Sequence, residues 1–123
     1  MADNWHELKF FSRDEFNYPD EMDEQFLRQL DVARKFAKVP FVINNDFRTP
    51  EDNERIGGVE NSPHLTGKAV DIEAIGGNMR FEIVMGLRAA GFLRMGVYDR
   101  HIHADACGPE THPQNQLWPG KSK

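Results

Sequence analysis

Two short segments of the chain alternate between apolar and polar residues, and this alternation constrains the fold more than any other feature of the sequence. In an extended chain every second side chain falls on the same face, so residues 68–73 and 101–105 each present two different faces. The apolar faces consist of Val70, Ile72, Ile102 and Ala104, and the polar faces carry Asp71, His101, His103 and Asp105. We therefore expect two strands, the first of them half-buried, with His and Asp side chains facing away from the apolar residues.

Two longer segments have the three- and four-residue spacing of amphipathic helices. The first begins at Asp23 and continues to Ala37, shortly before Pro40. The second begins near Gly76 and is expected to end at Gly91, because glycine suits the left-handed conformation found at helix C-termini.

Shorter elements connect these segments. Residues 12–15 have the spacing of a capping box and predict a helical turn, and Thr49-Pro50 predicts the start of a brief helix. Residues 41–43 are expected to form a buried strand that leads into a functional loop, and residues 92–98 a hairpin with 101–105. The chain therefore predicts an α+β fold, in which a small antiparallel sheet packs against two or three helices.

The length and charge of the chain limit its class. A chain of 123 residues with nine Phe fits one globular domain over residues 1–123, and we expect a monomer. The formal net charge is -5, so no strong positive field draws the molecule to nucleic acid or to anionic lipid. No segment approaches the roughly 20 apolar residues of a membrane span.

The cysteine content and the N-terminus add two expectations. Cys107 is the single cysteine, so an internal disulfide and a thiolate metal cage are both excluded, and any metal must bind to His, Asp or Glu. Residues 1–11 are interrupted by charged side chains and contain no apolar run of signal-peptide length. We expect synthesis in the cytoplasm without a signal peptide.

His64, Asp71 and His103 are the candidate metal ligands. Catalytic zinc typically takes three ligands from His and Asp or Glu and leaves a fourth position for water. Gly67 can turn the backbone between His64 and Asp71, so that both side chains converge on one ion. The pair of His101 and His103 alone would predict little, because a chain with five His often contains such a pair by chance.

The segment Ser62-x-His64-x2-Gly67-x-Ala69-x-Asp71 resembles the first zinc half-site of the M15 metallopeptidases, the group of D-alanyl-D-alanine carboxypeptidases. Its short single-domain branch is the most similar. Further landmarks of that branch occur in order, so the resemblance extends from about residue 10 to residue 118. They lie at residues 10–16, 47–50, 57–59, 91–92 and 113–118.

This resemblance implies a zinc peptidase with one zinc ion held by His64, Asp71 and His103. Its substrate would be a peptide bond next to a D-amino acid in a bacterial peptidoglycan stem peptide. Arg48 matches the arginine that the family uses near the substrate, where a guanidinium fork can hold a carboxylate or a developing oxyanion. An ion pair of Arg48 with Asp46 or Glu51 is the structural alternative.

The chain departs from the family at the general base. The carboxypeptidases usually carry Glu or Asp three residues before the last His ligand, and Arg100 stands there. His101 is the leading substitute, since a neutral imidazole can accept a proton near pH 7. Asp99 and Asp105 remain alternatives, and Asp105 could instead orient a ligand His.

Several functional questions stay open at the level of sequence. Cleavage by a carboxypeptidase and cleavage by an endopeptidase are both compatible with the motifs. A phage or prophage lysis enzyme, which reaches the wall after release or on a virion, fits the small size. The alternative is a non-catalytic module of the same fold, which binds the cell wall or belongs to a virion and keeps zinc only for stability. Arg100, in place of the usual carboxylate, favours this alternative.

Overall fold

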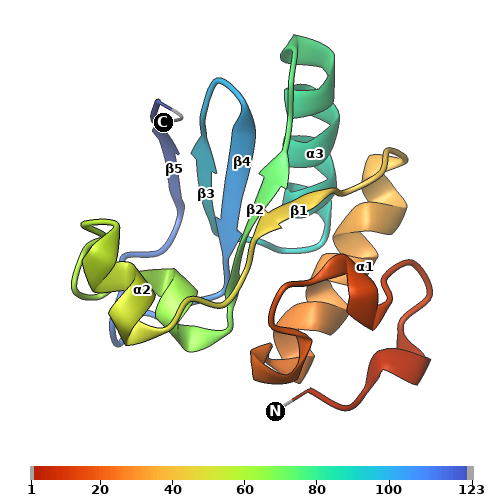
Figure 1. The fold of residues 1–123 in the computed structure, drawn as a ribbon. Helices are drawn as coiled ribbons and strands as arrows, with labels where there is room; N and C mark the ends of the chain where they lie inside the picture. The colour runs from red at the N-terminus through yellow and green to blue at the C-terminus, as the bar shows by residue number, and fades with distance from the viewer. Residues whose placement is uncertain (1, 122–123) are drawn as a thin grey trace.

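In the computed structural model, residues 2–121 are described, and they form three α-helices beside a five-stranded sheet (Figure 1). The helices are α1 (Glu24–Ala37), α2 (Pro50–Arg55) and α3 (Gly77–Ala89). The strands are β1 (Ile43–Asn45), β2 (Ala69–Glu73), β3 (Arg94–Val97), β4 (His101–Asp105) and β5 (Gln116–Pro119). Four single 3-10 turns complete the described part: η1 (Trp5–Glu7), η2 (Arg13–Glu15), η3 (Pro19–Glu21) and η4 (Pro63–Thr66).

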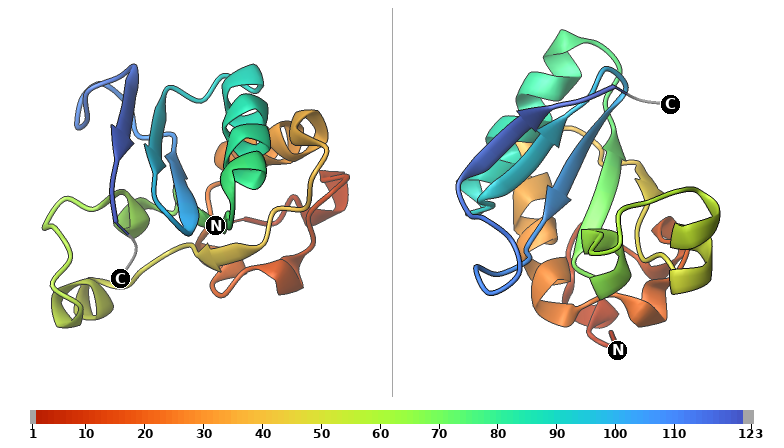
Figure 2. Two further views of the ribbon diagram at one scale, coloured as in Figure 1. Left: turned by 90° about the horizontal axis from the view of Figure 1, so that it is seen from above. Right: turned by 90° about the vertical axis from the view of Figure 1, so that its left-hand side faces the viewer.

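The sheet has the strand order β1-β2-β4-β3-β5, and helices α1 and α3 lie side by side against one of its faces (Figure 2). The pairs β1–β2, β2–β4 and β4–β3 are antiparallel, which confirms the predicted α+β fold and the hairpin. The edge pair β3–β5 is parallel, so the sheet is mostly rather than wholly antiparallel. None of the helices within residues 2–121 is long and apolar enough to cross a bilayer.

The predicted alternation in β2 and β4 is confirmed by burial. The four apolar side chains of these strands face α1 and α3 and are fully buried: Val70, Ile72, Ile102 and Ala104. On the other face, Asp71 is paired in register with His103. Strand β2 is not half-buried as expected, since residues 69–72 are buried on both faces. The polar face of β2 carries a cluster of side chains that largely excludes solvent.

Two boundaries differ from the sequence expectations. The first strand begins at Ile43, two residues later than predicted, and Phe41 fills the core from the preceding segment. The proline-rich tail contributes β5, which pairs with β3 through contacts distant in sequence. Local propensity cannot reveal such a pairing, because the partner strand supplies the stabilising contacts.

Helices α1 and α3 approach each other closely at Gly86. A Cβ atom at this position would lie 2.5 Å from Ala37 Cβ and 2.6 Å from the carbonyl oxygen of Ala33. Both separations are well inside van der Waals contact, so only glycine allows the two helix backbones to pack at this distance. This packing supports the apolar face of the sheet.

We predict that Gly86→Ala destabilises the protein. Overpacking a filled core costs about 1–3 kcal/mol. Alanine recovers at most about 1 kcal/mol through its better helix propensity. Urea denaturation should show a lower unfolding midpoint for this variant. Gly77→Ala is the matched control in the first turn of the same helix, where nothing lies within 4 Å of the added methyl group, and it should be neutral or stabilising. Equal stability of wild type and Gly86→Ala would contradict this account of the packing.

Candidate metal centre

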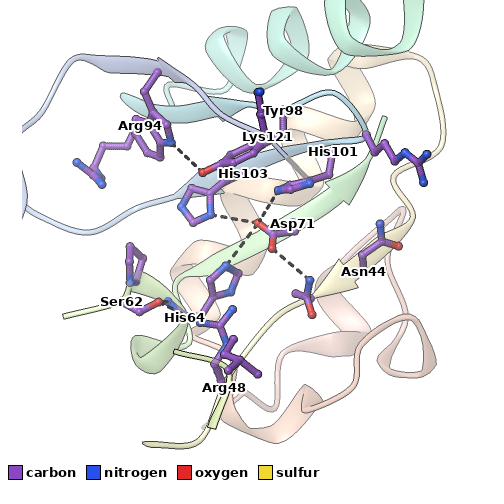
Figure 3. Close-up of a pocket in the computed structure, with 15 residues that line it drawn as sticks. Asn44, Arg48, Ser62, His64, Asp71, Arg94, Tyr98, His101, His103 and Lys121 are labelled. Carbon is purple, nitrogen blue, oxygen red and sulfur yellow. Dashed lines mark hydrogen bonds and ion pairs between the residues drawn. The ribbon is translucent and has the colours of Figure 1, made fainter. Parts of the chain in front are cut away.

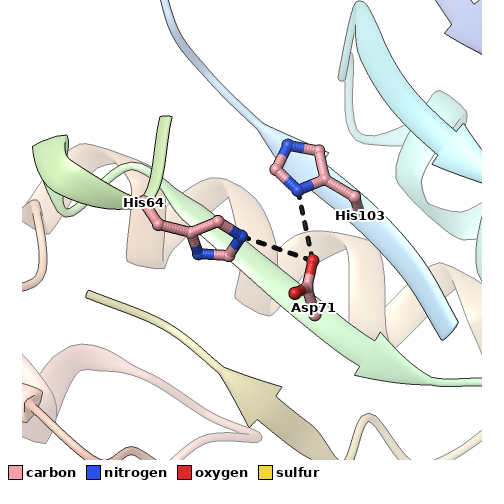
Figure 4. A group of neighbouring side chains, drawn as sticks. All are labelled: His64, Asp71 and His103. Atoms are coloured by element: carbon pink, nitrogen blue, oxygen red, sulfur yellow. Dashed lines mark hydrogen bonds and ion pairs between the residues drawn. The ribbon is translucent and has the colours of Figure 1, made fainter. Parts of the chain in front are cut away.

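The three candidate ligands meet on the face of the sheet opposite α1 and α3. His64 comes from η4, Asp71 from β2 and His103 from β4, and all three side chains are buried (Figure 4). One ligand atom from each lies within 4.8 Å of the others. Asp71 Oδ1 is 3.4 Å from His64 Nε2 and 3.2 Å from His103 Nδ1.

The backbone brings the three ligand side chains together. Asp71 and His103 are direct neighbours across the antiparallel pair β2–β4. His64 is brought in by η4, where the Ser62 hydroxyl accepts a hydrogen bond from the backbone N–H of His64. The turn ends at Gly67, which has a φ of 75° and whose Cβ would lie 2.3 Å from the carbonyl oxygen of Glu21. Gly67 is therefore needed both for its left-handed backbone and for its close approach to a neighbouring turn.

Each imidazole is oriented by a partner behind it. Nδ1 of His64 lies 2.7 Å from the carbonyl oxygen of Asp46, and a carbonyl can only accept, so Nδ1 carries the proton and Nε2 offers its lone pair. Nε2 of His103 lies 2.7 Å from Asp105 Oδ2, so His103 faces Asp71 through Nδ1. The two rings therefore present different nitrogens to the same point.

Asp105 lies behind His103, away from the pocket described below. Its carboxylate is 1% exposed and accepts hydrogen bonds from Arg94 Nε at 2.7 Å and from the backbone N–H of Cys107 at 3.2 Å. Arg94 is itself buried and donates a second bond, from Nη1, to the carbonyl oxygen of Pro113. This arrangement favours an orienting role for Asp105 over a role as general base.

The buried carboxylates are held in their charged form. Burial alone would raise the pKa of Asp71, but hydrogen bonds from His103 and His64 outweigh it and hold this pKa below its ordinary value. The pKa of Asp105 is likewise lowered, because bonds from His103 and Arg94 overcome its burial. For His103, burial would lower the pKa, but the bonds to Asp105 and Asp71 raise it. The contacts that lower the pKa of the two carboxylates therefore also raise the pKa of His103.

The donor set fits a metal of the zinc type. Two imidazole nitrogens and one carboxylate oxygen are a common set for catalytic zinc. Ligand atoms about 2.0–2.1 Å from a tetrahedral zinc ion lie roughly 3.3 Å apart. The contacts of Asp71 Oδ1 with His64 and His103, 3.4 and 3.2 Å, match this spacing. The group could hold one metal ion.

His64, Asp71 and His103, together called the metal group below, line an open pocket of about 590 Å³ (Figure 3). Four cationic side chains line this pocket, which is notable in a chain with a net charge of -5. The remaining lining residues are mainly polar or aromatic. The cations are Arg48, Arg94, Arg100 and Lys121, and the other lining residues include Asn44, Asn45, Ser62, Tyr98, His101 and Trp118.

Arg48 lines the pocket on the side of His64 (Figure 3). Its Nη1 donates to Asn53 Oδ1 at 2.8 Å and to the Ser62 hydroxyl at 3.4 Å. Both partners are neutral and leave the guanidinium charge in place. Arg48 forms no ion pair with Asp46 or Glu51, which was the structural alternative. The charge is therefore directed at the pocket.

The candidates for proton transfer occupy different places. His101 lines the pocket beside the metal group, with Nε2 3.9 Å from Asp71 Oδ1. Burial lowers the pKa of His101, although Asp71 opposes this effect. Asp99 lies in the turn between β3 and β4, where its backbone carbonyl accepts a bond from Arg80, and it does not line the pocket. Arg100 does line it.

Sequence analysis missed several contributors. Asn45 donates from Nδ2 to Asp71 Oδ2 at 3.2 Å, a contact that follows from its register opposite Asp71. Arg94 and Tyr98 were assigned only to a strand. Trp118 belongs to the family landmark at residues 113–118, and the structure shows that it also lines the pocket. The pairing of β5 with β3, which creates this wall, has no local sequence signal.

Comparison with known proteins gave one family. A family model described as Peptidase M15 matches residues 12–105, which is more than half of the chain and includes His64, Asp71 and His103. A search of curated proteins gave no match. Strand β5, with Trp118, lies beyond the matched residues.

We predict that Asp105→Asn weakens metal binding about 10- to 100-fold, the usual cost of losing a partner behind a ligand histidine. Asparagine keeps the size of the side chain but removes the negative charge that bonds to His103 and Arg94. Competition with a chromogenic chelator measures the affinity. Asp20→Asn makes the same chemical change at an exposed carboxylate and should leave the affinity unchanged. Equal affinities for Asp105→Asn and wild type would remove Asp105 from the orienting role.

Proposed function

This chain belongs to the M15 peptidase family, and from that premise we propose that it is a zinc-dependent peptidase acting on bacterial peptidoglycan stem peptides. One observation carries the proposal: His64, Asp71 and His103 converge at the base of an open pocket within the matched residues. The cleaved bond lies next to a D-amino acid, in the manner of a D,D-carboxypeptidase or an endopeptidase. A phage or prophage lysis enzyme is the biological role that we propose for this activity.

Zinc is the proposed ion, held by His64 Nε2, an Asp71 oxygen and His103 Nδ1. The spacing and chemistry of these atoms support it, as described above. Bound zinc supplies the Lewis acidity that polarises a carbonyl and activates water. The protein's part is to orient both imidazoles, through the backbone carbonyl of Asp46 behind His64 and the carboxylate of Asp105 behind His103.

Arg48 binds the substrate in this proposal. Its guanidinium group lies at the pocket wall, and its partners Asn53 and Ser62 hold it in place without neutralising its charge. A planar guanidinium suits bidentate binding of a carboxylate, such as the one at the end of a stem peptide. Lys121, which also lines the pocket, supports the choice of an anionic substrate.

His101 is the proposed proton-transfer group. It faces the pocket next to Asp71, and burial holds its pKa low, so the ring is neutral near pH 7 and can accept a proton. Asp105 is a weaker candidate because its oxygens already bond to His103 and Arg94. Asp99 remains an alternative that the variants below distinguish.

A second candidate function is a module that binds the wall or belongs to a virion and keeps zinc for stability. Arg100 favours it, because this residue lines the pocket at the position where the family usually carries its carboxylate. Such a module would bind wall fragments and zinc without turnover. The same experiment separates the two functions.

The test is digestion of purified peptidoglycan fragments with the zinc-loaded protein, followed by mass spectrometry of the products. We predict loss of a terminal residue or cleavage within the stem, which identifies the bond. Chelation should abolish the products, and added zinc should restore them. Binding of fragments without any cleavage by zinc-loaded protein would favour the non-catalytic module and overturn the peptidase.

We predict that His101→Ala lowers turnover about 10²- to 10⁴-fold, the usual contribution of a general acid or base, with zinc content near wild type. His112→Ala is the matched control, since His112 is half-buried and bonds to the backbone of Asn61 outside the pocket. Asp99→Ala should cost less. Wild-type turnover in His101→Ala, together with an inactive but zinc-loaded Asp99→Ala, would transfer the role to Asp99.

A further inference from the structure

Tyr98 lies on the side of the pocket that faces Arg48 across the metal group (Figure 3), and its hydrogen-bond partner Trp118 lines the same pocket. The Tyr98 ring stacks on His101, with centroids 4.2 Å apart and an angle of 12° between the planes. Trp118 Nε1 donates a hydrogen bond of 3.3 Å to the Tyr98 hydroxyl oxygen. The Tyr98 side chain is therefore held both at its ring and at its hydroxyl group.

Two glycines make room for this pair. A Cβ atom at Gly96 would lie 2.4 Å from Trp118 Nε1, and one at Gly120 would lie 2.1 Å from the Tyr98 ring. Gly96 is in β3, directly opposite Trp118 of β5. Glycine within a strand weakens it and marks a close approach of another group. Gly96 thus weakens β3 to make room for Trp118, and Gly120, just after the end of β5, makes room for Tyr98.

The pair is also tied to the metal group. The Trp118 ring lies 5.5 Å from the His103 ring, and the Arg94 guanidinium lies 5.1 Å from the Trp118 ring in a cation–π contact. Arg94 is anchored by Asp105, the partner of His103. The position of the Tyr98 hydroxyl is therefore fixed relative to the ligands.

The hydrogen-bond chemistry gives the hydroxyl a direction. An indole N–H can only donate, so the Tyr98 oxygen accepts from Trp118 and its own proton points elsewhere. The side chain lines the pocket, where that proton can meet a substrate acceptor.

We propose that Tyr98 is a catalytic residue that donates a hydrogen bond to the oxygen of the scissile carbonyl, with Trp118 as the residue that positions its hydroxyl. The proposal rests on the peptidase function proposed above. Arg48 on the opposite wall then binds the substrate carboxylate, and the two residues have separate tasks. The bond from Tyr98 strengthens as negative charge grows on the carbonyl oxygen, so it lowers the barrier more than it stabilises bound substrate.

The test compares variants on the peptide that wild type cleaves. Tyr98→Phe keeps the ring and its stacking but removes the donor, and kcat should fall about 10²-fold, with KM and zinc content little changed. Trp118→Phe should cost less, and adding it to Tyr98→Phe should cost nothing more, because the indole acts through the phenol. Tyr18→Phe is the control, since Tyr18 packs on Phe47 away from this pocket.

A binding measurement supplies a readout that does not depend on turnover. A phosphinate peptide mimics the tetrahedral, negatively charged reaction centre, and calorimetry should show about 10²-fold weaker binding to Tyr98→Phe than to wild type. Affinity for the cleaved product peptide should stay the same. Full kcat and full phosphinate affinity in Tyr98→Phe, with an active wild type, would overturn this inference alone. An inactive zinc-loaded wild type would overturn the proposed function and this inference with it.

Discussion

The antiparallel register of β2 against β4 is the constraint on which the rest of the site depends. It sets Asp71 directly beside His103 and places both on the face opposite α1 and α3. A slip of one residue in either strand would turn that strand's polar side chains into the apolar core. Burial of Val70 and Ile102 on the inner face therefore fixes the ligands on the outer face. Core packing and metal chemistry depend on the same pairing.

Hydrogen bonds stabilise the buried charges of the site. Asp71, His103 and Asp105 are almost completely removed from solvent, and an unpaired charge there would be costly. Asp105 avoids this cost through Arg94 and His103, and Asp71 through the two imidazoles. The same contacts that satisfy the charges also turn each ring toward one point.

Much of this arrangement could be predicted from the sequence because it depends on local periodicity. The period of two placed Asp71 and His103 on one face, and the turn ending at Gly67 brought His64 toward them. The Peptidase M15 family match agrees with the resemblance seen in the motifs. What the sequence could not supply comes from distant contacts. The parallel pairing of β5 with β3 depends on tertiary packing, and it alone brings Trp118 to the pocket.

The central proposal is that one zinc ion binds to Nε2 of His64, Nδ1 of His103 and a carboxylate oxygen of Asp71. Anomalous diffraction from zinc-loaded crystals tests it most directly. The account predicts a single peak at the zinc absorption edge, with His64 Nε2, an Asp71 oxygen and His103 Nδ1 as protein ligands at about 2.0–2.2 Å. An anomalous peak elsewhere in the molecule, or ligation of His103 through Nε2 with its bond to Asp105 broken, would contradict it.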